Sequence, residues 1–202
     1  MNGIQKLLFV AASCVLSTAC LAQVAISGVR YEAGTELRGG THLQLNGAGT
    51  RFRGPFKVYT AGLYLSRKAA TPEEALALPG AKRLSVTMLR DIDASELGKL
   101  FIRSVEDNMD RTAFSKLIPG LMRMSQIFSD HRKLASGDSL TIDWLPGVGT
   151  VISVRGVPQG EPFREPEFYT ALMRIWLGPV PADWQLKEQL LGRPLRVNTG
   201  TT

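Results

Sequence analysis

The segment Leu45–Leu65, LNGAGTRFRGPFKVYTAGLYL, constrains the fold of this chain more than any other stretch. A Gly-Ala-Gly break leads into the basic residues Arg51 and Arg53, and a run of alternating aromatic, aliphatic and small residues follows. Alternation of this kind is typical of a β-strand, and it places two sets of residues on opposite faces: Tyr59, Ala61, Leu63 and Leu65 on one, and Thr60, Gly62 and Tyr64 on the other. We therefore expect the guanidinium of Arg51, which is always charged, at the mouth of an apolar β-rich element, where it can fork toward a carboxylate or an enolate.

The remaining sequence predicts strands on both sides of a helical middle. The predicted strands are Val24–Tyr31, His42–Leu45, Phe56–Leu65, Lys82–Leu89, Ser139–Leu145 and Thr150–Arg155. The predicted helices begin at Thr71-Pro72 and at Asp93, cover about Thr112 to Leu134 and Glu165–Leu177, and end with one that holds Trp184, Leu190 and Leu191. Apolar residues at helical spacing in the last two helices are predicted to lie in the core, namely Trp176, Leu177, Leu190 and Leu191. Pro119 is expected to start a second helix rather than to sit inside one. Most strands are neighbours in sequence, which predicts an antiparallel sheet with helices packed on one side, an α+β fold.

The first 22 residues carry the pattern of a secretory signal peptide. Lys6 precedes the apolar run Leu7–Ala22, which is too short for a comfortable membrane span. Small residues at Cys20 and Ala22 fit a cleavage site before Gln23. The sequence therefore predicts export to the periplasm, with residues 1–22 removed.

Two other interpretations of this end of the chain fit less well. One is a buried N-terminal helix, and the other is a lipoprotein anchored through Cys20, which would need an aliphatic residue where Ser17 stands. With cleavage before Gln23, both cysteines leave with the signal, so the mature chain has neither a disulfide nor a cysteine nucleophile. Residues 23–202 contain no repeat or long linker and are predicted to form one domain.

Charge and motif content narrow the function classes. Without Lys6 the chain has 23 basic and 18 acidic side chains, a net charge of +5, which allows weak contact with an anionic membrane surface. No dense Lys/Arg run with interleaved aromatics occurs, so no nucleic-acid partner is predicted. His42 and His131 lie far apart with no acidic residue at a ligand-like spacing, and no dinucleotide loop or serine-hydrolase elbow is present. We predict no metal and no cofactor.

The segment Leu45–Leu65 resembles the first core motif of the chalcone isomerase fold family, which reads roughly GAG-x-R, then G-x-F, then T-A-x-G-x-Y-L. The matching residues are Gly47, Ala48, Gly49, Arg51, Gly54, Phe56, Thr60, Ala61, Gly62, Tyr64 and Leu65. Gly137–Gly156 and Phe168–Gly192 look like later motifs of the bacterial, exported branch of chalcone isomerase-like proteins. The resemblance implies an open-faced β-sandwich: a large antiparallel sheet, a layer of helices, and a ligand cleft between them.

The resemblance implies an isomerase as one function. In the plant enzymes an arginine stabilises the negative charge that develops on a carbonyl oxygen, while threonine and tyrosine hydroxyls hold a water near it. Arg51 and Thr60 would take the arginine and threonine roles of an intramolecular lyase acting on an enone. The enzymes' catalytic tyrosine lies in the helical middle, however, and residues 91–140 contain no tyrosine. The second catalytic group is therefore missing.

The other implied function is lipid binding. Relatives of this fold that are not enzymes bind fatty acids, the arginine pairing with the carboxylate while the tail fills an apolar cleft. The favoured hypothesis is thus an exported protein that binds a fatty acid or similar amphipathic anion through Arg51, Thr60 and Tyr64. Three alternatives stay open: Arg51 ion-paired to an acidic neighbour, Tyr64 as a half-buried strand tyrosine, and a fold with a filled cleft that serves only as an interaction module.

Overall fold

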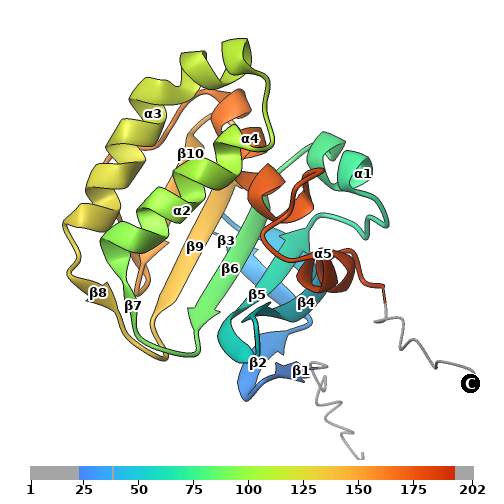
Figure 1. Ribbon diagram of the computed structural model, residues 1–202. Helices are drawn as coiled ribbons and strands as arrows, with labels where there is room; N and C mark the ends of the chain where they lie inside the picture. The colour runs from blue at the N-terminus through green and yellow to red at the C-terminus, as the bar shows by residue number, and fades with distance from the viewer. Residues whose placement is uncertain (1–22, 38, 194–202) are drawn as a thin grey trace, which may run out of the picture.

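The computed structural model describes residues 23–37 and 39–193, so the predicted signal peptide lies outside the described residues. The described strands form one large antiparallel sheet in the order β11-β10-β9-β6-β5-β4-β3 and two small ribbons, β1-β2 and β7-β8 (Figure 1). The strands are β1 (Gln23–Ile26), β2 (Val29–Glu32), β3 (Gly34–Leu37), β4 (Thr41–Arg53), β5 (Phe56–Leu65), β6 (Lys82–Met88), β7 (Ile92–Asp93), β8 (Lys133–Leu134), β9 (Ser139–Leu145), β10 (Gly149–Val154) and β11 (Val157–Pro158).

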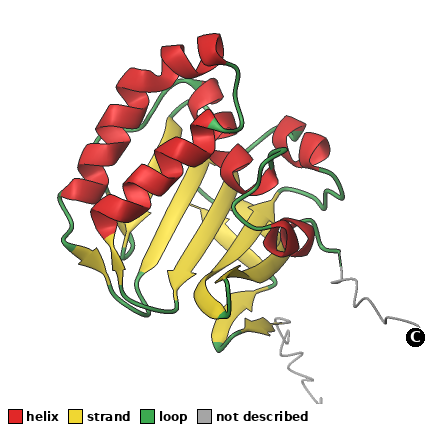
Figure 2. Ribbon diagram, in the orientation of Figure 1, coloured by secondary structure: helices red, strands yellow, loops and turns green. Residues whose placement is uncertain are grey.

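The helices gather on one face of the large sheet (Figure 2). They are α1 (Pro72–Ala77), α2 (Ala94–Glu106), α3 (Arg111–Ser129), α4 (Pro166–Leu177) and α5 (Trp184–Leu190). We call this side of the sheet the helix face, and the opposite side, which the β1–β2 ribbon covers in part, the ribbon face. The predicted α+β architecture, with helices on one side of an antiparallel sheet, is confirmed.

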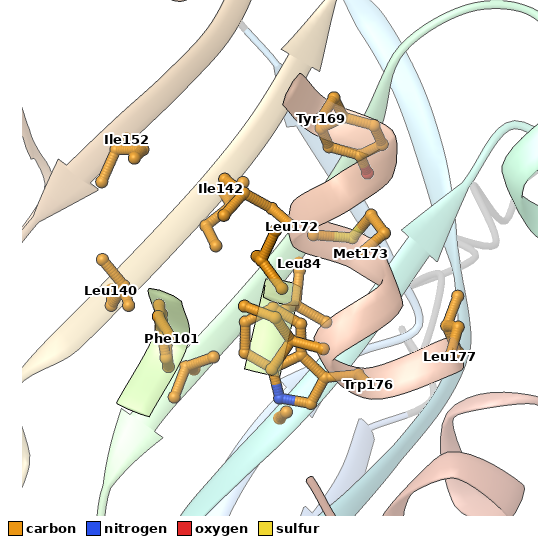
Figure 3. Close-up of a cluster of buried hydrophobic side chains, with 14 of the residues drawn as sticks. Leu84, Phe101, Leu140, Ile142, Ile152, Tyr169, Leu172, Met173, Trp176 and Leu177 are labelled. Carbon is orange, nitrogen blue, oxygen red and sulfur yellow. The ribbon is translucent and has the colours of Figure 1, made fainter. Parts of the chain in front are cut away.

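The core fills the space between the helix face and the helices. Side chains of α4 project toward the sheet, with Leu172 and Trp176 beside Leu84 of β6 (Figure 3). The predicted core residues of the C-terminal helices are 0–4% exposed, namely Trp176, Leu177, Leu190 and Leu191. A smaller apolar cluster around Tyr31 lies on the ribbon face.

Three predicted boundaries are wrong. The helix predicted to reach Leu134 ends at Ser129, and Lys133–Leu134 form the strand β8. The predicted strand Val24–Tyr31 is divided by a turn at Ser27-Gly28 into β1 and β2. The predicted break at Pro119 does not occur, because α3 runs through it. Pro119 is exposed, so water can replace the backbone hydrogen bond that proline removes from the helix. The buried side chains of Leu117 and Leu121 hold the helix against the core on either side of the proline.

The Gly-Ala-Gly segment is also not a break, because β4 continues through it. Gly47 and Gly49 lie on the helix face directly under α5, paired with Leu63 and Ala61 of β5. A Cβ atom at Gly47 would lie 2.0 Å from the backbone oxygen of Gln189. Glycine is therefore required because the end of α5 approaches the strand so closely.

Candidate functional site

Arg51 and Tyr59 form a pair on the helix face near the β4–β5 turn. They lie directly opposite each other in the antiparallel register, so their side chains project from the same side of the sheet. The guanidinium carbon of Arg51 lies 5.5 Å from the centroid of the Tyr59 ring, a cation–π contact. The Tyr59 side chain is fully buried, and its hydroxyl accepts a 2.9 Å hydrogen bond from Nε1 of Trp176. The arginine thus lies over a core tyrosine ring that Trp176 holds in place.

Burial keeps the tyrosine of this pair neutral. Burial raises the pKa of the Tyr59 hydroxyl, and the positive charge of Arg51 opposes part of that rise. At neutral pH Tyr59 therefore presents a neutral hydroxyl beside a permanent cation.

Arg51 has no acidic partner in the described part of the chain. It is half-buried, its Nε is buried without a hydrogen-bond partner among residues 23–37 and 39–193, and no carboxylate there lies within ion-pair distance of it. Asp183, whose charge reaches Tyr59, accepts backbone N–H groups of Phe52, Gln185 and Leu186 instead. The described residues therefore do not provide the structural ion pair that was one interpretation of Arg51.

Thr60 and Tyr64 lie on the ribbon face, away from Arg51. Thr60 is fully buried and accepts a 2.8 Å hydrogen bond from the Tyr31 hydroxyl, while Tyr64 donates to the backbone oxygen of Glu32 at 3.2 Å. Between them, a Cβ atom on Gly62 would lie 2.5 Å from the Tyr31 ring. Thr60, Gly62 and Tyr64 thus hold β2 against the sheet. The structure does not bring the three predicted ligand-binding residues together, and the Arg51–Thr60 pair of the predicted isomerase is split across the sheet.

Sequence reasoning did not find the role of Tyr59, and a β-bulge explains why. Arg53 pairs with Phe56 around the turn, so regular counting would place Val58 opposite Arg51. The register shifts between Arg51 and Phe52 and brings Tyr59 opposite Arg51 instead. Trp176 was predicted as core only, and its bond to Tyr59 joins residues far apart in sequence.

Comparison with family models matches residues 23–192 to the family described as chalcone isomerase-like. The chain belongs to the chalcone isomerase-like family. Among solved structures, the fold is similar to that of a fatty-acid binding protein of Arabidopsis thaliana, with a TM-score of 0.67 and 16% sequence identity over 84% of this chain and 96% of that chain. A similarity at this identity shows the shared fold alone. A comparison of the sequence with curated proteins gives no match.

Two other features of this chalcone isomerase-like protein bear on binding. A cleft of about 490 Å³ lies between α3 and the segment before α4, where the Arg123 guanidinium lies 3.6 Å from the Phe163 ring centroid. Lys82 is only 6% exposed, lies 5.9 Å from the Tyr169 ring centroid, and forms no ion pair with any described residue. Burial lowers the pKa of the Lys82 ammonium. Neither feature contacts Arg51.

Within residues 23–37 and 39–193, no three His, Cys, Asp or Glu side chains gather to hold a metal ion. No helix in this part of the chain is both long and apolar enough to cross a membrane.

Proposed function

We propose that this protein is an exported binder of a fatty acid or similar amphipathic anion, whose carboxylate pairs with Arg51. The observation that carries the proposal is the buried Nε of Arg51, which has no partner among the described residues. A buried donor left without an acceptor costs free energy, and a carboxylate that accepts from the guanidinium fork would remove that cost. Burial of the tail would supply most of the affinity, about 0.8 kcal/mol per methylene.

The packing beneath Arg51 determines how the hydrocarbon tail of a bound fatty acid would enter the protein. Tyr59, Phe101 and Trp176 are 0–3% exposed, and the rings of Phe101 and Trp176 meet edge to face at 5.3 Å between centroids. A tail enters this layer only if the helices move away from the sheet, and α4 carries Trp176. The Trp176–Tyr59 hydrogen bond would then change on binding, which makes the indole a reporter of ligand entry. A relative of the same fold that binds fatty acids supports the proposal.

The experiment compares binding of a long-chain fatty acid with binding of the fatty alcohol of equal length to the mature chain, by titration calorimetry without membranes. Arg51→Met keeps most of the apolar stem but removes the charge, and should weaken the acid about 10- to 150-fold, the equivalent of 1.5–3 kcal/mol. It should leave the alcohol unchanged. Arg53→Met, on the same strand, is the matched control and should leave both affinities unchanged. Equal losses in Arg51→Met and Arg53→Met, or wild-type binding of the alcohol as tight as the acid, would refute the carboxylate role.

Export is the second part of the proposal and rests on Lys6 followed by Leu7–Ala22. N-terminal sequencing of the protein from its own cells should start at or near Gln23. An intact Met1 in the soluble cytoplasmic fraction would contradict export and would leave the ligand proposal untouched.

A further inference from the structure

Exposed aromatic side chains lie at the β4–β5 turn and at the start of α5. Phe52, Phe56 and Trp184 are 38%, 60% and 61% exposed. Phe52 and Phe56 flank the turn, and the Phe52 N–H donates to Oδ2 of Asp183 at 2.9 Å, which places Trp184 next to the hairpin. Single exposed apolar side chains are ordinary, but three large exposed rings around one hairpin turn mark an interaction site.

The same corner is basic. Arg53 and Lys57 are exposed beside the turn, and the Arg90 guanidinium lies 5.3 Å from the Phe56 ring centroid. Lys187 repeats this arrangement, with its ammonium 4.9 Å from the Trp184 ring centroid. None of these four cations forms an ion pair with another residue of the described chain.

The nearby carboxylate of Asp183 forms no ion pair with these cations. Asp183 uses both oxygens to accept backbone N–H groups, from Phe52 on one side and from the first turn of α5 on the other. We define the aromatic-basic corner as Phe52, Arg53, Phe56, Lys57, Arg90 and Trp184. It combines exposed rings with cations that form no ion pair with any described residue.

We propose that the aromatic-basic corner docks this protein on an anionic phospholipid bilayer. Tryptophan and phenylalanine rings enter the headgroup region of a bilayer, while flanking lysine and arginine side chains contact anionic headgroups. Protein–protein interfaces are depleted in lysine, so the exposed Lys57 favours a lipid surface over a protein partner. The cations thus match the anionic headgroups of a membrane surface, and the rings match the less polar region just beneath them.

The location of the corner links docking to the ligand site, and this step rests on the proposed function. Arg51 lies two residues before Arg53 on β4, and Tyr59 lies three residues after Phe56 on β5. A fatty acid that leaves the bilayer at the corner would therefore meet the Arg51 guanidinium next to the headgroup region. Docking would deliver the ligand with its carboxylate already at the cation.

Vesicle flotation tests the docking. The mature chain should float with vesicles that contain phosphatidylglycerol, less with pure phosphatidylcholine vesicles, and less as salt is added, because screening weakens the contact. Phe56→Ser, Trp184→Ser and the charge reversal Lys57→Glu should each lower the bound fraction about fivefold or more. Met122→Ser and Lys116→Glu are matched controls, since Met122 is 64% exposed and Lys116 is exposed on α3, and both should bind as the wild type does.

A second readout is tryptophan fluorescence, which should shift to shorter wavelength on anionic vesicles in the wild type but not in Trp184→Ser. The docking proposal is overturned if the wild type ignores phosphatidylglycerol, if Met122→Ser loses as much binding as Phe56→Ser, or if an acidic protein binds the corner while vesicles do not. Failure of docking and failure of the ligand site are distinguishable. Arg51→Met acts on the fatty acid in vesicle-free solution, and Lys57→Glu acts on vesicles that carry no free fatty acid.

Discussion

Replacement of Gly47 by alanine tests whether α5 docks on β4 as closely as the structure shows. The added Cβ would lie 2.0 Å from the backbone oxygen of Gln189 and 2.8 Å from that of Leu190, whereas ordinary contact begins at 3.4 Å. Both obstacles are backbone atoms, which cannot rotate away as a side chain can. The end of α5 must therefore move by more than an ångström, or β4 must bend.

The magnitude follows from what that movement disturbs. Overpacking of a well-packed site costs about 1–3 kcal/mol. Movement of α5 also loosens Leu186 and Leu190, which are fully buried, and each is worth about 1.5–3 kcal/mol when fully buried. The hydrogen bond from Asn46 Nδ2 to the Leu190 oxygen, 2.7 Å long, would be strained as well. We expect Gly47→Ala to lower the free energy of unfolding by about 2–4 kcal/mol.

Urea unfolding followed by circular dichroism measures this loss, and the melting temperature should fall by about 5–15 °C. Gly98→Ala is the matched control, because its Cβ would meet only the Phe128 side chain, at 3.2 Å, and alanine favours the helix. That variant should stay within about 1 kcal/mol of the wild type. A Gly47→Ala protein within about 0.5 kcal/mol of the wild type would refute the close approach of α5.

Two further predictions concern buried titratable groups. Burial raises the pKa of Tyr64 from 10.0 to about 12, so its contribution to stability is complete below pH 10 and is lost as the pH rises through about 12. Urea unfolding should show this decline, and a Tyr64→Phe variant with the same decline between pH 10 and 12 would contradict it. Lys82→Met removes a buried charge that has no acidic partner among the described residues, and should stabilise the protein by about 1 kcal/mol at pH 7. A loss of about 1 kcal/mol or more in denaturant unfolding would show that the ammonium is paired.

Local sequence patterns correctly predicted strand faces and a helix start. Period-2 alternation in Phe56–Leu65 placed Tyr59 on one face and Thr60 with Tyr64 on the other, and the structure confirms both faces. The capping pattern at Asp93 correctly started α2, where the carboxylate accepts the Glu96 N–H at 3.0 Å. These features depend on residues within a few positions of one another, so a single sequence contains the information.

Of the three predicted ligand-binding residues, only Arg51 lies on the helix face. Its motif marked a cation beside apolar strands, but the partners were wrongly grouped, because Thr60 and Tyr64 are engaged by β2 on the ribbon face. Tyr59 takes the place next to the arginine through a bulge that shifts the register by one residue. A single sequence has no unique signature for a bulge, because its position depends on how both paired strands pack.

The sequence by itself determined the kinds of elements, the α+β class and the family motif that contains Arg51. Only the tertiary structure decided which groups surround Arg51 and why the motif has glycines. Gly47 is required by the C-terminal end of α5, and the ring beneath Arg51 is fixed by a hydrogen bond to Trp176. The physical reason is range: propensity and periodicity act over one or two turns, whereas close approach and burial depend on segments that meet only after the chain has packed.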